Sequence, residues 1–182
     1  MAFAVLLPAA RAQAAPDISK IEWQISSGRS NSGKAIYKPI AKWIQRPNGK
    51  SPGHMRIVAT LTNKGPVVLS GNILRCAVSA HLVPADKSAS LNNSFTEPGP
   101  LEAPGLWALP FWLEERRVPK INPGQTLSAT IPHIDLRNYL KKLSRTGFWP
   151  DSLKVQLMLE PRIGDNLEKN MHESIIKIDK AE

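Results

Sequence analysis

Four histidines and one cysteine are the residue types of this chain best suited to bind a transition metal, and they are also candidates for a catalytic base or nucleophile. The histidines lie in separate segments, and no His-x-His, His-Glu-x-x-His or paired-cysteine spacing brings two ligands together. The chain also lacks the glycine-rich loops, Gly-x-x-x-x-Gly-Lys and Gly-x-Gly-x-x-Gly, that bind nucleotide phosphates. We therefore expect no metal site and no cofactor. The four histidines are His54, His81, His133 and His172.

Covalent and acid–base catalysis find no support in the sequence either. Cys76 lies in the apolar stretch Ile-Leu-Arg-Cys-Ala-Val, and we interpret it as a buried thiol that packs as a small hydrophobe. Glu114 and Glu115 are adjacent, so in a strand they point to opposite faces, and Arg116 and Arg117 are expected to neutralise them. No Gly-x-Ser-x-Gly motif occurs. We expect no catalytic residues and a protein that is not an enzyme.

The segment Leu-Trp-Ala-Leu-Pro-Phe-Trp-Leu at 106–113 carries more apolar surface than any other run that follows the N-terminal segment. In a regular strand its alternate residues would make both faces apolar, so it would be buried on both sides or meet a partner on one. Pro110 removes a backbone donor from its centre, which disfavours an interior strand. We expect an edge strand or a strapping loop. One face would carry Trp107, Leu109, Phe111 and Leu113, and the other Ala108, Pro110 and Trp112.

Aromatic side chains bind protein partners with little loss of conformational entropy, because their rings are large and rigid, and arginine is also enriched at protein interfaces. Core packing is the competing interpretation for each tryptophan. The residues predicted to form a binding surface are Trp107, Phe111, Trp112, Arg116, Arg117 and Trp43.

Alternation of apolar and polar residues predicts most of the remaining elements as short strands. Residues 35–44 contain Pro39, which indicates an edge strand or a strap. Ser26–Gly33 is polar and is expected to be a loop, and Trp149-Pro150-Asp151 is expected to be a turn. Residues 84–105 form the longest stretch without periodicity and are expected to be a long loop. Strands are predicted at 18–25, 55–62, 73–83, 127–131, 153–160 and 174–178.

Residues 135–143 carry leucine and tyrosine at helical spacing behind Asp135, a residue that commonly caps a helix N-terminus. They predict one short amphipathic helix, either facing the core or lying on a membrane surface. Many short strands with a helical crossover near the end predict an all-β, antiparallel, immunoglobulin-like or fibronectin-like β-sandwich of seven to eight strands. The late order of elements is similar to that in bacterial modules of this type. We expect one domain over 15–182.

Residues 1–14 are apolar and end in an Ala-Gln-Ala pattern, which is typical of a secretory signal peptide, although no basic residue precedes the apolar run. We therefore expect either that the true N-terminus lies upstream of Met1 or that the segment is a frayed tail. No stretch approaches the length of a transmembrane helix. Export and a single cysteine favour a bacterial periplasm or exterior.

The net charge of +9 favours an acidic protein, an acidic glycan or anionic lipid. Nucleic acid is not expected, because the basic residues are dispersed apart from Arg116-Arg117 and Lys141-Lys142. Our leading hypothesis is an exported, non-enzymatic β-sandwich that binds a protein partner in the cell envelope through residues 106–113 and the loop before them. The alternatives are a module that binds or helps to process glycans, and a basic protein that binds anions or lipid surfaces. The oligomeric state is open.

Overall fold

The computed structural model describes residues 16–45, 54–84, 106–134, 136–143, 145–160 and 170–180. The predicted signal peptide at 1–14, Asp135 and nearly all of the predicted loop at 84–105 lie outside these residues. The described elements are β1 (Asp17–Arg29), β2 (Ala35–Ile40), β3 (Lys42–Gln45), β4 (Met55–Thr62), β5 (Ile73–Pro84), β6 (Leu106–Trp107), β7 (Trp112–Arg117), β8 (Thr126–Ile134), α1 (Leu136–Leu143), β9 (Phe148–Leu159) and β10 (Met171–Lys180).

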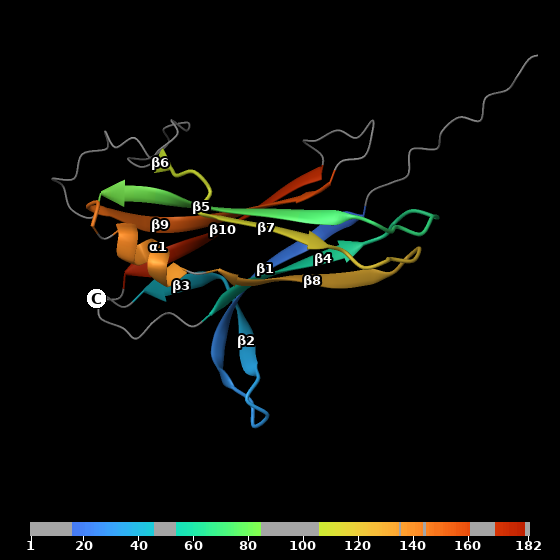
Figure 1. Ribbon diagram of the computed structural model, residues 1–182, viewed down its shortest axis with the longest axis horizontal. Helices are drawn as coiled ribbons and strands as arrows, with labels where there is room; N and C mark the ends of the chain where they lie inside the picture. The colour runs from blue at the N-terminus through green and yellow to red at the C-terminus, as the bar shows by residue number, and fades with distance from the viewer. Residues whose placement is uncertain are drawn as a thin grey trace, which may run out of the picture.

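These strands form two packed sheets, which confirms the predicted all-β sandwich (Figure 1). One sheet has the order β2-β1-β4-β8. The other has the order β3-β10-β9-β5-β6, with β7 also paired to β5. Helix α1 lies at one end of the sandwich, and the hairpin of β1 and β2 extends away from the body (Figure 1). The described strands exceed the predicted seven to eight because the edges contain additional short strands.

Alternating side chains from both sheets fill the space between them. Every second residue of β5 from Leu74 to Leu82, and of β9 from Leu153 to Leu159, is at most 4% exposed, because a strand turns successive side chains to opposite faces. The β4 residues Met55, Ile57, Ala59 and Leu61 meet them from the other sheet and are at most 1% exposed. The inward residues of β5 and β9 are Leu74, Cys76, Val78, Ala80, Leu82, Leu153, Val155, Leu157 and Leu159.

The loop predicted at Ser26–Gly33 is wrong in extent, because β1 continues to Arg29 and pairs with β2. Only the turn between Ser30 and Lys34 reverses the chain, and it is closed by a 2.7 Å hydrogen bond from the Ser30 amide to the Lys34 carbonyl. Gly33 has a φ of 76°, a conformation that costs glycine little. Polar residues therefore form a projecting hairpin, whose strands need no buried face.

The predicted edge position of residues 35–44 is confirmed. Pro39 lies in β2, the outer strand of its sheet, where its missing N–H breaks no ladder. The chain then crosses at Ala41 into β3, which pairs in parallel with β10 at the edge of the other sheet. One segment thus supplies an edge strand to each sheet.

The short helix is confirmed as α1, with Lys141 and Lys142 in its last turn. The turn predicted at Trp149-Pro150-Asp151 is wrong, because these residues belong to β9. Pairing of β9 with β10 stops at Ser152, so Pro150 has no neighbour on that side among the described strands and its missing N–H is tolerated.

Leu157→Ala should lower the free energy of unfolding by about 2 to 5 kcal/mol, because Leu157 is fully buried and the smaller side chain leaves a cavity. Ile175→Ala, at a site 56% exposed on β10, should change it by less than about 0.5 kcal/mol. Urea denaturation followed by circular dichroism measures both. Equal effects would contradict the assignment of faces.

Candidate binding site

The apolar run at 106–113 forms one interrupted edge strand on β5. Trp107 pairs with His81 and Trp112 pairs with Val78, so two residues of β5 face four residues of the run. The two additional residues produce a bulge that contains the exposed Leu109 and Pro110. This confirms the edge position expected from Pro110. The predicted alternation is confirmed on either side of the bulge, because two additional residues preserve the strand period: Trp107 and Leu113 face outward, and Trp112 faces the core. It is wrong for Phe111, which packs against the core instead of sharing the outer face.

Trp107 lies on the outer face of the six-stranded sheet and is half-buried. Its ring centroid is 5.2 Å from that of His81, and the Lys154 ammonium lies 4.7 Å from the ring centroid. His81 is held in turn by a 2.8 Å contact between its Nδ1 and the Asp151 carboxylate. The tryptophan is therefore held among polar neighbours rather than presented as an open ring.

Phe111 and Trp112 turn toward the interior. The Phe111 ring stacks on Tyr139 of α1, with centroids 3.9 Å apart and planes inclined by 11°. Trp112 lies opposite the buried Val78 and packs against the core. Trp43 is 4% exposed on β3, at the opposite edge of the same sheet, so the fold does not bring it to this surface.

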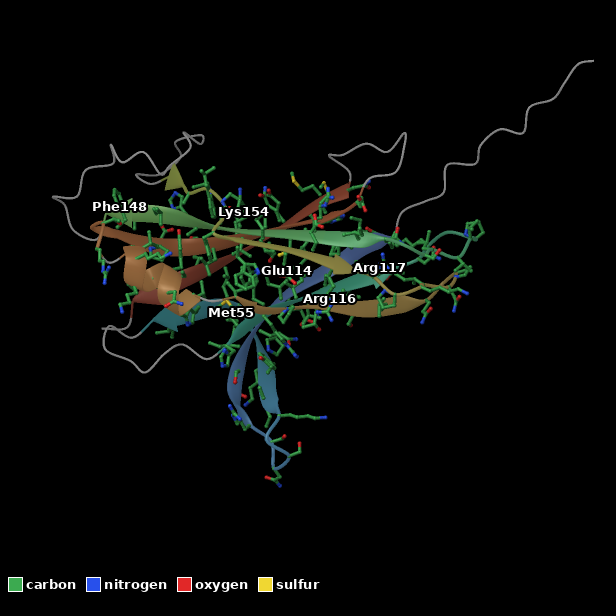
Figure 2. The ribbon with its side chains drawn as sticks, viewed as in Figure 1. Met55, Glu114, Arg116, Arg117, Phe148 and Lys154 are labelled. Atoms are coloured by element: carbon green, nitrogen blue, oxygen red, sulfur yellow. The ribbon has the colours of Figure 1, made fainter. Side chains whose placement is uncertain are left out.

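The two arginines have different surroundings (Figure 2). The Arg116 guanidinium donates a hydrogen bond to the Thr130 carbonyl on β8, which connects the facing edges of the two sheets. Arg117 lies opposite Ile73, and both arginines are exposed to solvent. Glu114 and Glu115 point to opposite faces as predicted. The expected neutralisation by the two arginines is wrong for Glu115, which pairs with Arg75 at 2.9 Å.

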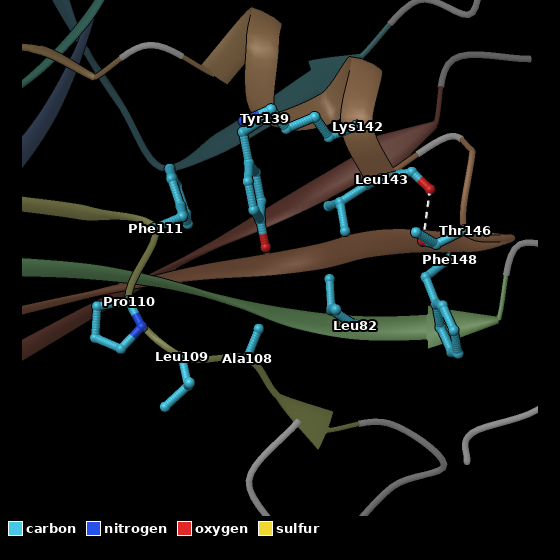
Figure 3. Close-up of a pocket in the computed structure, with 10 residues that line it drawn as sticks. All are labelled: Leu82, Ala108, Leu109, Pro110, Phe111, Tyr139, Lys142, Leu143, Thr146 and Phe148. Atoms are coloured by element: carbon cyan, nitrogen blue, oxygen red, sulfur yellow. Dashed lines mark hydrogen bonds between the residues drawn. The ribbon is translucent and has the colours of Figure 1, made fainter. Parts of the chain in front are cut away.

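A cavity of about 320 Å³ lies between the bulge and α1 (Figure 3). The sequence did not indicate it, because its walls come from three segments far apart in the chain. The only available signal was the stripe of leucine and tyrosine on the helix beside the lysines of its last turn. The lining residues are Leu82, Ala108, Leu109, Pro110, Phe111, Tyr139, Lys142, Leu143, Thr146 and Phe148.

Leu109 and Leu113 are 54% and 72% exposed, although both belong to this apolar run. No strand within the described part of the chain pairs with the outer side of β6 or β7. The site therefore combines exposed leucines, an available strand edge and an apolar cavity directly behind the bulge.

Within the described ranges, no group of three or more histidine, cysteine or carboxylate side chains is arranged to hold a metal ion. Cys76 is buried on the inner face of β5. Burial, with a smaller contribution from the charge of Glu114, raises the pKa of Cys76 to about 12. The thiol is therefore protonated at neutral pH, as expected for a residue that packs as a small hydrophobe.

No protein-family model matches the chain, and no curated protein sequence shows significant similarity to it. Across the residues that the structure describes, no helix is long and apolar enough to cross a membrane.

Cys76 should not react with iodoacetamide at pH 8 in the folded protein, because with a pKa of about 12 roughly one thiol in ten thousand is ionised. When the chain is unfolded in about 8 M urea, the Cys76 thiol should react with iodoacetamide at the rate of free cysteine. Mass spectrometry measures the adduct. Rapid labelling without denaturant would show that the thiol is accessible.

Arg116→Ala should lower the free energy of unfolding by about 1 kcal/mol, because the hydrogen bond to the Thr130 carbonyl is lost. Arg117→Ala is the matched control at the next, exposed position and should change it by less than about 0.5 kcal/mol. Chemical denaturation compares the two variants. A larger loss for Arg117→Ala would contradict a bridging role for Arg116.

Proposed function

We propose that this protein is a non-enzymatic binding protein that docks a protein partner along the edge formed by β6, the Leu109-Pro110 bulge and β7. One observation carries the proposal: Leu109 and Leu113 are exposed on an edge that pairs with β5 on its inner side and with no described strand on its outer side. An extended partner segment can add main-chain hydrogen bonds to such an edge and cover the leucines.

Single exposed apolar residues are common on protein surfaces and need no explanation. Leu109 and Leu113 differ because they flank Pro110 and the half-buried Phe111 in one short segment. The neighbouring outer face of the sheet is polar, with ion pairs from Arg75 to Glu115 and Glu160. An apolar edge bordered by charged groups is typical of a protein interface with an apolar centre and a polar rim.

Glycan binding has less support than protein binding. A sugar stacks on an open aromatic face, whereas the Trp107 ring is flanked by His81 and Lys154. Trp112 packs inward, and Trp43 is in the core. Of the six predicted binding residues, Phe111 lines the cavity and Arg117 is an exposed cation at the end of β7 on the docking edge.

We also infer that the sandwich is of the immunoglobulin-like type. In that fold strands A, B and E are neighbours in one sheet, and strands C, F and G are neighbours in the other. The orders β1-β4-β8 and β5-β9-β10 correspond to these two sets in chain order. Strands β6 and β7 lie beside β5, where variable-type domains have strand C′.

Export to a bacterial periplasm or exterior is part of the proposal, and its support is the composition of residues 1–14. A docking edge of this kind suits a partner in the cell envelope. The long loop predicted at 84–105, which our leading hypothesis includes in the binding surface, lies almost entirely outside the described residues.

The double substitution Leu109→Asp and Leu113→Asp should abolish capture of the partner, because it places two charges in the apolar centre of the interface. Both side chains are exposed, so the urea midpoint should be preserved. Affinity capture from an envelope extract of the native host, followed by mass spectrometry, measures the loss.

Ile44→Asp is the matched control. Ile44 is 53% exposed on β3, the opposite edge strand of the same sheet, and its substitution should leave capture unchanged. Equal capture by the wild-type protein and the double variant would show that this edge is not the docking surface.

A further inference from the structure

The cavity between α1 and the bulge is more than a packing defect, because it opens to solvent between two well-defined walls. Leu82 of β5, Phe148 of β9 and Leu143 of α1 contribute buried apolar side chains. The stacked Phe111 and Tyr139 rings contribute the half-buried side (Figure 3). A site of about 320 Å³ falls at the small end of the range of roughly 300 to 1,000 Å³ that binds small molecules.

The polar groups at this cavity are few, and they are donors. Figure 3 shows the Tyr139 ring extending from α1 toward β5, with its hydroxyl at the far end. Lys142 is exposed and contributes to the lining, so its aliphatic chain borders the cavity while its ammonium stays near water. The Thr146 hydroxyl donates a 2.7 Å hydrogen bond to the Leu143 carbonyl.

The charge at the cavity is unbalanced. Among the residues that the structure describes, no acidic side chain lines it, and neither the Tyr139 hydroxyl nor the Lys142 ammonium has a hydrogen-bond or ion-pair partner. Burial raises the pKa of Tyr139 to about 12, so the phenol remains a donor throughout the physiological range. A cation and a phenolic donor beside an apolar cavity complement an anion that carries an apolar chain.

We propose that this cavity binds a single-chain carboxylate amphiphile, with the hydrocarbon chain among Leu82, Phe111 and Phe148 and the carboxylate at Lys142 and Tyr139. An apolar cavity of about 150 Å³ holds benzene, so a site of this size accommodates a chain of roughly ten carbon atoms. The inference goes beyond partner docking at the strand edge, and it depends on residues of α1 that do not belong to that edge.

Isothermal titration calorimetry with decanoate, below its micelle concentration, tests the proposal directly. Decanoate should bind with a stoichiometry of one, whereas decanol should bind at least fivefold more weakly and decyltrimethylammonium more weakly still. Raising the salt concentration should weaken decanoate but not decanol, because only the carboxylate is screened. Absence of decanoate binding, or equal binding of all three amphiphiles, would overturn the proposal.

Two substitutions locate the carboxylate. Lys142→Gln and Tyr139→Phe should each weaken decanoate roughly fivefold and leave decanol unchanged, because each removes one polar contact and keeps the apolar wall. Lys141→Gln is the matched control, since Lys141 precedes Lys142 on the same helix and does not line the cavity. An equal loss in Lys141→Gln and Lys142→Gln would mean general electrostatic attraction and would overturn the assigned site.

A third variant tests the position of the chain. Ala108→Leu places additional carbon atoms in the cavity and should weaken decanoate and decanol alike. Unchanged affinity for both ligands in a folded Ala108→Leu protein would place them elsewhere and overturn the proposal. Lys142→Gln should leave partner capture at the Leu109 and Leu113 edge intact, so the two proposals fail separately.

Discussion

Burial of alternating aliphatic side chains between the two sheets is the interaction on which the rest of this structure depends. Val78 of β5, Val155 of β9 and Ile57 of β4 are fully buried, and they come from three different strands of the two sheets. The strand period of two therefore determines which residues face inward. The Trp23 indole adds a polar connection between the sheets by donating a 3.1 Å hydrogen bond to the Ser174 hydroxyl.

Pro110 connects the packing of the core to the shape of the proposed binding surface. Pro110 cannot donate a hydrogen bond, and it lies in the bulge where the edge strand leaves the regular ladder of β5. The bulge exposes Leu109 and lets Phe111 reach across to Tyr139. One backbone irregularity thus supports both the apolar edge and one wall of the cavity.

Charge is distributed differently over the outer face of the six-stranded sheet and over the cavity beside α1. The outer face of the sheet balances its charges, as in the pairing of Arg75 with Glu115. At the cavity Lys142 has no acidic counterpart among the described residues that line it. Balanced ion pairs at exposed positions contribute little to stability, whereas an unbalanced cation beside apolar surface favours an anionic ligand. The balanced outer face therefore has no preference for a charged ligand, whereas the cavity favours an anion.

The sequence by itself determined the class of fold, the helix at 136–143 and the edge position of the apolar run, because each follows from a local period or from the missing donor of a proline. It did not determine which aromatic residues are exposed. Trp43 and Trp112 resemble Trp107 in local sequence context, and only packing between strands distant in the chain separates core from surface. The cavity likewise exists only because the tertiary structure brings α1 to the bulge, and the leucine and tyrosine stripe of the helix alone could not predict which segment would form its other wall.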